Sequence, residues 1–576
     1  MSDEGGVIDL ATAGPNPMHM RSGPGISWTT ANFGEAIPGV QTPLCLSFWV
    51  DASESSLRRM SVDLGAYSRR EARIADPARV ADGRYMGTFY GRMCGNITQF
   101  RALADRMPAT SGDAFEEQIF GVVRTGGQSR ARRRRYPMVA AKLPVAALRV
   151  PPTLVAARRA NEAWWRAAVA DPGTELPSAL ATLNEAFRRF ETLIHAQALV
   201  GMLAQACFER VRALAAVAGL PGAEAELVTG YGGMEETLLL TDLWQTARDG
   251  MSMAQFLSRH GFHGPSTGDI TTPSWREDPA QLDALLPVYR DLPDDQAPTR
   301  RQEAQVAARQ AMEARLLTAL PALQRPVARL ALRLTARFVP LREVGKAAYV
   351  QAFDVARAAA RAAGAALEKE GIVADAGDVF FLTRDELRAG LPEDVAGVVA
   401  ERRSFHAACR RVTIPEYWEG MPPLRPTAGA GTGRPVQAEP ASGLRMRDSS
   451  DCVGGIAQPG RHGGPGGPVS LDGIGVSPGV ITGRARVIHD PLVETTLEPG
   501  EILVCATTNP AWITLFLVAG ALVIDVGGPL SHGAIAAREL GIPCVINTHH
   551  GTAHLRTGDL VVVDGDRGTV RPAPEE

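Results

Sequence analysis

Residues 523–546 read VIDVGGPLSHGAIAARELGIPCVI. A short apolar run ends at a Gly-Gly pair, and a pattern typical of a helix follows. Ser531 is a favourable N-cap residue, and Gly541 suits the left-handed position after a helix, with a proline two residues later to stop it. The stretch therefore predicts a strand, a tight turn and a short helix whose first turn contains His532.

The first turn of a helix is a favourable place for a histidine that carries an anion. Unpaired backbone N–H groups and the positive end of the helix dipole converge there. Gly528 and Gly533 have no side chain to keep a substrate from the backbone. A neutral imidazole is a competent nucleophile near pH 7. By residue type alone, a histidine that merely caps the helix is the more ordinary interpretation, so the case for a phosphohistidine depends on the whole motif.

The segment GGPLSHGAIAARELGIPCV resembles the phosphohistidine swivelling domain of the phosphoenolpyruvate-utilising enzymes. The resemblance extends through IGVSPGVITGRARVI (474–488), TTNPAWITLF (507–516) and GDLVVVDGDRGTV (558–570). It implies a β/β/α domain in which His532 accepts phosphate from an ATP-grasp domain and passes it to a second site. The matching motif also implies phosphate or substrate binding by Gly528, Ser531, Gly533 and Arg538.

The chain of 576 residues is long enough for several domains. We expect a multidomain α+β protein with a flexible lead at 1–27 and a mainly helical region at 28–425. Residues 426–470 are crowded with Gly and Pro and predict a flexible linker. Short apolar runs between turn residues then predict a strand-rich domain at 471–572.

The region before the linker is similar to the acceptor-binding domain of rifampin phosphotransferase and the phenylphosphate synthase group. The similarity is carried by several segments in the family's order, among them NFGEAIPGVQTPL (32–44), GFHGPSTGDITTPSWREDP (261–279) and LREVGKAAY (341–349). It implies that 28–425 binds a small organic acceptor, with Asp269 and Arg276 as candidate substrate-binding residues.

LREVGKAAY also supports this interpretation on physical grounds. Arg342 and Lys346 are four residues apart on an expected helix, so both cations project from one face and suit a phosphoryl group. Glu343 is expected either to accept a proton from an acceptor hydroxyl or to orient a cation. The alternative is an ordinary solvated face of basic residues.

Two departures from the family pattern change the expected function. His263 and Thr267 stand near the places where the family's loop often has a His-Arg-Gly segment and a following glutamate, whereas Asp269 is retained. We therefore expect the acceptor chemistry or specificity to differ. The resemblance begins at about residue 28, with no Gly-rich phosphate loop and no room for an ATP-grasp domain. We therefore expect no cofactor on this chain, and ATP and Mg²⁺ on a separate ATP-grasp subunit.

Composition excludes other classes of function. A net charge of −3 gives no reason to expect a nucleic-acid partner. Seven scattered cysteines and no apolar stretch of about 18 residues predict a cytoplasmic protein without a membrane span. His549, His550 and His554 are close in sequence but lack supporting ligands, so we predict no metal site.

The sequence thus favours a phosphotransferase of dikinase type that passes phosphate through His532 to an organic hydroxyl or phenol. Two alternatives stay open. One is a ligase-like relative of the prodigiosin-type condensing enzymes, and the other is a non-catalytic phosphocarrier or regulatory protein, which would not need the cations at 342 and 346.

Overall fold

The structure of the chain, a computed structural model, describes most of the sequence. The described residues are 10 and 14–573, apart from 32, 74–80, 109, 121–122, 125–128, 221, 232–234, 427–445, 448–469, 490–496, 509–511 and 529–530. The expected flexible linker at 426–470 lies outside the described residues, except for Pro426, Met446, Arg447 and Ser470.

Helices fill most of 28–425 and a mixed sheet forms from 471–572, which confirms the expected fold class. The helices are α1 (Phe33–Ala36), α2 (Pro43–Asp63), α3 (Ile97–Ala104), α4 (Gly112–Phe120), α5 (Tyr136–Ala170), α6 (Leu176–Val217), α7 (Ala223–Leu227), α8 (Glu235–Ala247), α9 (Met253–His260), α10 (Ala280–Asp291), α11 (Pro298–Ala319), α12 (Arg325–Lys369), α13 (Arg384–Ala389), α14 (Val395–Arg410), α15 (Ile513–Phe516), α16 (His532–Leu540) and α17 (Gly551–His554). The strands are β1 (Ser27–Thr29), β2 (Met86–Phe89), β3 (Arg92–Asn96), β4 (Val123–Arg124), β5 (Val412–Thr413), β6 (Tyr417–Glu419), β7 (Arg425–Pro426), β8 (Met446–Arg447), β9 (Leu471–Asp472), β10 (Ile474–Ser477), β11 (Val480–Val487), β12 (Ile502–Cys505), β13 (Ala521–Ile524), β14 (Cys544–Ile546), β15 (Leu560–Asp564) and β16 (Thr569–Pro572).

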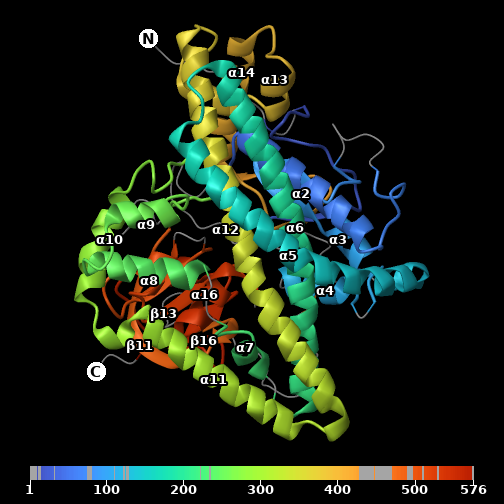
Figure 1. The fold of residues 1–576 in the computed structure, drawn as a ribbon, viewed down its shortest axis with the longest axis vertical. Helices are drawn as coiled ribbons and strands as arrows, with labels where there is room; N and C mark the ends of the chain where they lie inside the picture. The colour runs from blue at the N-terminus through green and yellow to red at the C-terminus, as the bar shows by residue number, and fades with distance from the viewer. Residues whose placement is uncertain are drawn as a thin grey trace.

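Three long helices, α5, α6 and α12, form the framework of the helical region (Figure 1). Their sequences are rich in Ala, Leu and Arg, which favour helix, and α6 and α12 each begin with a proline near the N-terminus, where its missing N–H costs nothing. At Gly345 of α12, the side-chain oxygen of Gln197 from α6 occupies the place that a Cβ would take. Glycine therefore allows α12 to lie close against α6 at this point.

A small sheet of order β2-β3-β1-β6 joins the two ends of the helical region, because Trp28 of β1 pairs with Trp418 of β6. The expected loose lead, 1–27, ends at the first residue of β1, and some of its side chains before that point are buried. Met18 and His19 are buried, at 0% and 2% exposure, and the His19 ring lies 4.2 Å from that of Tyr90. Met18 and His19 of the lead thus pack against the helical region, a contact that the Gly and Pro content of the lead did not indicate.

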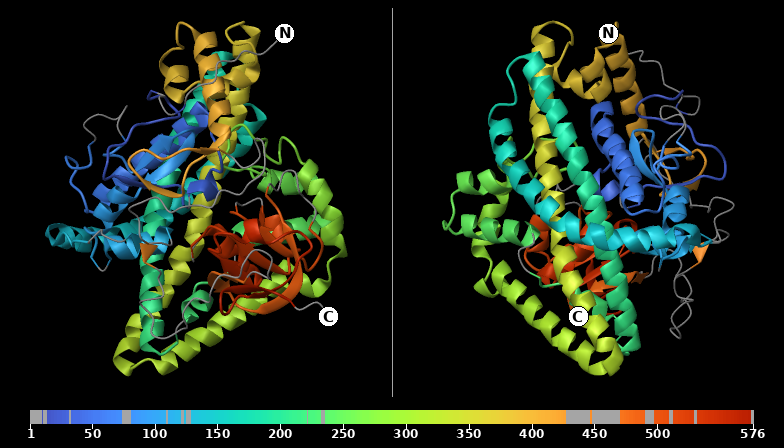
Figure 2. Two further views of the ribbon diagram at one scale, coloured as in Figure 1. Left: turned by 180° about the vertical axis from the view of Figure 1, so that it is seen from behind. Right: turned by 45° about the vertical axis from the view of Figure 1, so that its right-hand side comes forward.

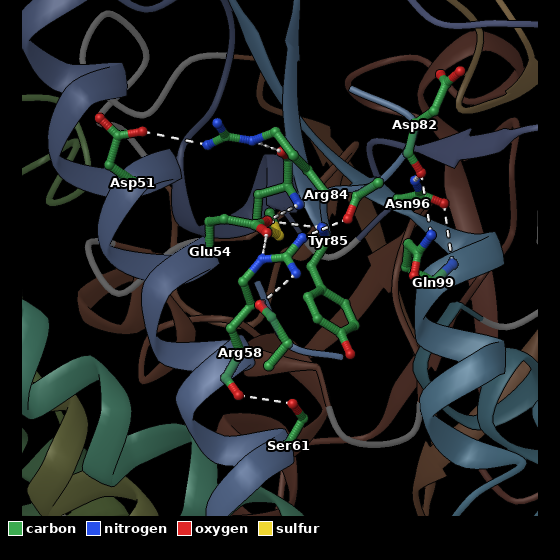
Figure 3. A network of polar contacts seen from close by, with 12 residues as sticks. Asp51, Glu54, Arg58, Ser61, Asp82, Arg84, Tyr85, Asn96 and Gln99 are labelled. Carbon is green, nitrogen blue, oxygen red and sulfur yellow. Dashed lines mark hydrogen bonds and ion pairs between the residues drawn. The ribbon is translucent and has the colours of Figure 1, made fainter. Parts of the chain in front are cut away.

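A polar network fastens α2 to this sheet (Figure 3). The buried carboxylate of Glu54 accepts hydrogen bonds from the backbone N–H groups of Tyr85 and Met86, at 2.7 and 2.9 Å. Its other oxygen pairs with Arg58 at 2.5 Å. The carboxylate thus satisfies two buried backbone donors at the start of β2 and fixes the hairpin on the helix.

The C-terminal residues form a sheet of order β10-β14-β13-β12-β11-β15-β16-β9. The central strands β11, β12, β13 and β14 are parallel, and the flanking pairs are antiparallel. Parallel strands need crossover connections, and α15 and α16 supply them for β12–β13 and β13–β14.

The C-terminal sheet lies between α12 and the helices α8 to α11, as two opposite views of the molecule show (Figures 1 and 2). One apolar cluster contains Phe256 and Tyr289 from these helices together with Phe516 and Leu540 from the C-terminal domain. The Tyr289 hydroxyl also donates to the carbonyl of Thr514 at 2.8 Å. The structure therefore shows the two parts of the chain docked.

One helix among the described residues, 133–170, is long and apolar enough to cross a membrane by length and composition. From the sequence we expected no apolar stretch of this length. The helix lies against α6 and α12 and buries Val139, Leu154 and Trp165. Only 22% of its most apolar window is buried in the structure.

We predict that Glu54→Ala lowers the free energy of unfolding by about 3 kcal/mol, because it leaves buried N–H groups without an acceptor. Arg188→Ala is the control: it removes a surface pair with Glu185 whose arginine is 68% exposed, and should change stability by less than about 0.5 kcal/mol. Urea unfolding followed by tryptophan fluorescence measures both. Equal losses in the two variants would contradict the role given to Glu54.

Candidate functional site

Helix α16 has the predicted start and end. The Ser531 hydroxyl accepts a hydrogen bond from the N–H of Ala534 at 3.4 Å, and Gly541 has the left-handed φ of 63°. The helix follows β13 at the carboxyl end of the parallel strands, the edge at which ligands bind in open α/β sheets. His532 is its first residue, and its side chain is outside the described ones.

The start of α16 packs closely on its own domain. A Cβ at Gly533 would stand 2.6 Å from Cδ1 of Ile524 and 2.7 Å from Oγ1 of Thr508. The Ser531 N–H donates to the Gly528 carbonyl at 2.9 Å. A larger residue at position 533 would therefore clash with Ile524 and Thr508. Glycine lets the start of α16 pack between β13 and the loop that follows β12.

The expected cluster on α12 forms. Glu343 is 4% exposed, and its two oxygens lie 3.6 Å from Nε of Arg342 and 3.8 Å from Nζ of Lys346. A carboxylate between two cations restrains both side chains electrostatically. The cations thus occupy one face of the helix, as their spacing predicts.

This face of α12 meets α16 across a small cavity of about 30 Å³. Arg342 and Glu343 line it from α12, and Ile535, Arg538 and Glu539 line it from α16. Positions 535 and 539 follow 532 by about one and two helical turns, so all three share a helix face. The cavity has room for about two water molecules and none for an organic acceptor.

Arg538 is buried at this contact. Its Nε donates to the carbonyl of Val476 at 2.7 Å, and burial lowers the pKa of its guanidinium to about 10. The nearby Arg342 contributes to this decrease, whereas Cys544, Glu224 and Glu539 oppose it. The site therefore holds several cations in a place of limited solvation, where an anion is favourable.

Asp269 lies in a different place. Its carboxylate accepts from the N–H and the hydroxyl of Thr271, at 2.8 and 2.7 Å, and lines a polar pocket of 440 Å³. Other walls of the pocket come from Gln41 before α2, from His406 of α14 and from Thr507 and Trp512 of the C-terminal domain. The pocket thus forms where both parts of the chain meet.

Arg276 is held away from both cavities by its neighbours. Its guanidinium lies 3.3 Å from the fully buried Asp354 of α12, which also accepts from Trp165 and Arg357. These contacts fasten the loop 261–279 to α12. The structure thus gives Arg276 a contact with α12 rather than with a cavity.

Several residues of these cavities were not singled out from the sequence. Glu539 follows His532 by seven residues, and His406 and Arg410 are four apart on α14, so the same helical spacing that drew attention to Arg342 and Lys346 applies to them. Burial lowers the pKa of His406, and Arg410 lowers it further. A neutral imidazole therefore faces the polar pocket.

Comparisons with known proteins agree with this architecture. Residues 497–568 match the family model "PEP-utilising enzyme, mobile domain", and residues 208–343 match "Rifampicin phosphotransferase fourth domain". The matched parts contain α16 and the start of LREVGKAAY, which line the small cavity from its two sides.

Curated relatives show the same similarity. Rifampicin phosphotransferase of Streptomyces sviceus is 30% identical over 369 residues, which are 62% of this chain and 39% of that protein. An uncharacterized protein of Mycobacterium tuberculosis is 33% identical over 315 residues (54% and 31%). The prodigiosin synthesizing transferase PigC of Serratia marcescens is 27% identical over 336 residues (58% and 35%).

The chain spans about a third of the length of these relatives. Residues 208–343 are thus similar to the fourth domain of rifampicin phosphotransferase, and the region 497–568 that follows is similar to the mobile domain of phosphoenolpyruvate-utilising enzymes.

Proposed function

We propose that this chain is the phosphohistidine-carrying, acceptor-binding subunit of a dikinase-type phosphotransferase. A separate ATP-grasp subunit, which binds ATP and Mg²⁺, transfers the β-phosphoryl group of ATP to a ring nitrogen of His532. The γ-phosphate leaves to water as inorganic phosphate, and AMP is released. The phosphohistidine then gives the group to an acceptor hydroxyl, whose proton is lost as the histidine is regenerated.

The observation that carries this proposal is the contact between α16 and α12. Arg342, Glu343 and Arg538 line one cavity, on the face of α16 that also contains position 532. Electrostatic stabilisation of a transferring phosphoryl group by fixed cations is a large catalytic effect in such reactions. We assign Glu343 the orientation of Arg342 and Lys346, because one of its oxygens lies near each cation.

The polar pocket is our candidate for the acceptor site. Thr507 lines it, and the next residue, Thr508, contacts Gly533 beside the helix start. Hydroxyl and amide groups of Gln41, Ser266 and Thr271 suit an organic molecule with hydroxyl groups, and Trp512 offers an aromatic wall for a phenol.

The place of action that we propose is the cytoplasm. The six described cysteines are free and buried, as expected in a reducing compartment.

A ligase-like activity is the second candidate, because PigC, a transferase named for synthesizing prodigiosin, is among the relatives. In that case the phosphorylated acceptor would be consumed by coupling to a second molecule. Mass spectrometry of the products separates the two: a stable phosphoproduct supports phosphotransfer, and a coupled product without phosphate supports the ligase.

We expect ATP labelled at the β-position, incubated with the ATP-grasp partner, to leave acid-labile and base-stable label on this chain. His532→Ala should abolish this label, because the nucleophile is gone. His554→Ala, in the same domain, is the control and should keep it. Unchanged labelling of His532→Ala, or label derived only from the γ-phosphate, would overturn the assignment of a dikinase mechanism through His532.

Lys346→Ala should leave charging of His532 unchanged and slow discharge to the acceptor by about 10²-fold, because it removes a charge-assisted contact to the moving group. Lys369→Ala is the matched control: it lies on the same helix about 35 Å away and is exposed. Single-turnover measurement of the two half-reactions checks this. Equal loss of charging and discharge in Lys346→Ala would place the lysine outside the transfer site.

Gly533→Ala should reduce charging of His532 and lower stability by about 1–3 kcal/mol, because the added methyl group meets Thr508 and Ile524. Gly201→Ala in α6 is the control, since nothing lies within 4 Å of its Cβ, and it should be neutral or stabilising by up to about 1 kcal/mol. Thermal unfolding and phosphate labelling measure both effects. Normal charging of Gly533→Ala would mean that the helix start tolerates displacement.

A further inference from the structure

Three potential metal ligands meet in the helical region, and none of them lines either of the two cavities described above. They are Glu235 at the start of α8, His260 at the end of α9 and His263 in the loop that follows. One ligand atom from each lies within 4.8 Å of the other two. Among the described residues, no other group of three or more His, Cys, Asp or Glu side chains meets this condition. The histidines at 549, 550 and 554, which are close in sequence, do not form such a group.

The environment of His260 is that of a metal ligand. Its Nε2 lies 2.9 Å from the carboxylate of Asp242, and its Nδ1 is buried without a hydrogen-bond partner among the described atoms. When one ring nitrogen of a neutral histidine donates to a carboxylate, the other nitrogen carries no proton and its lone pair is available as a ligand. This is the usual arrangement for a histidine that binds a metal. The residue is 4% exposed, so water cannot readily satisfy this lone pair.

His263 and Glu235 are held in place by different contacts. The His263 ring is 7% exposed and lies 4.2 Å from the ring of Phe262 and 5.8 Å from that of Trp275. Such an apolar shell excludes solvent and strengthens coordination. Glu235 pairs with Arg158 at 3.2 Å, which positions its carboxylate but also competes with a bound cation.

The types of ligand atom determine which metal ions this group can bind. Two imidazoles and one carboxylate suit Zn²⁺ and similar divalent transition metals, whereas Ca²⁺ and Mg²⁺ prefer oxygen ligands. A tetrahedral zinc ion with bonds of about 2.1 Å places its ligand atoms about 3.4 Å apart. The side chains therefore need to close by about 1 Å, a movement that small rotations about their χ angles supply.

We propose that Glu235, His260 and His263 bind one divalent transition-metal ion of the zinc class, with Asp242 as the carboxylate that orients His260. The ion would join α8, α9 and the loop 261–279. Because Asp269 of this loop lines the polar pocket, the metal would fix one wall of that pocket without contacting the phosphoryl group. The proposal does not depend on phosphorylation of His532.

Metal binding to the full chain tests this directly. The EDTA-treated protein is titrated with Zn²⁺ against a chromophoric competitor and, separately, with Co²⁺, whose visible absorption reports four-coordinate geometry. We expect one ion per chain, and resistance of the loop 261–279 to proteolysis should rise when zinc is bound. Absence of stoichiometric binding at micromolar free metal would overturn the proposal.

Matched variants locate the ion. His260→Ala and the isosteric Glu235→Gln should weaken zinc binding by at least about tenfold, and Asp242→Asn by about 10- to 100-fold. The double variant His550→Ala/His554→Ala removes the other close histidine pair, whose rings are 5.9 Å apart, and should bind normally. Circular dichroism checks the fold of each variant. Binding that is lost with His550 and His554, or retained in Glu235→Gln, would place the ion elsewhere.

Discussion

The close packing of α12 against α6 and α5 is the constraint on which the rest of this molecule depends. Gly345 lets α6 approach at the centre of the contact, and Asn161 of α5 donates to the carbonyl of Ala348 at 2.9 Å. One rigid helix then carries the cations near 342–346 and, about 12 Å further along, the buried carboxylate of Asp354 that holds the loop 261–279. The charged face and the pocket loop therefore have a fixed mutual distance.

The docked mobile domain brings cations of two separate sequence regions into one cavity. Arg342 comes from the helical domain and Arg538 from α16, and the buried Glu343 and Glu539 accompany them. Two guanidinium groups in a poorly solvated space repel each other unless an anion lies between them. Glu343, 3.6 Å from Arg342, and Glu539 offset this repulsion in the docked arrangement.

Local patterns in the sequence predicted the helix at His532, the helical framework and the shared face of Arg342 and Lys346, because each depends on residues within two or three turns of one another. The contact between α12 and α16 could not be predicted in this way. It depends on apolar packing between residues such as Tyr289 and Phe516, which are far apart in sequence. The buried lead around Met18 was missed because average composition conceals single anchoring residues.

The same reasoning explains the outcome for the candidate site. Asp269 and Arg276 are seven residues apart in one motif, yet Asp269 lines a pocket and Arg276 pairs with the buried carboxylate of Asp354. The loop turns between the two residues, so their spacing in sequence does not predict a shared site. The Glu235–His260–His263 group is likewise invisible to spacing rules, since Glu235 joins it from the start of another helix. Geometry of this kind arises only in the folded chain.

The polar pocket has walls from both parts of the chain, with Asp269 and His406 on one side and Thr507 and Trp512 on the other. A molecule that touches both walls binds the docked arrangement more tightly than the separated one. By thermodynamic linkage, docking must raise the affinity for that molecule by the same factor. Binding in the pocket and docking of the mobile domain therefore favour each other, and a molecule bound between the two walls holds the two parts of the chain together.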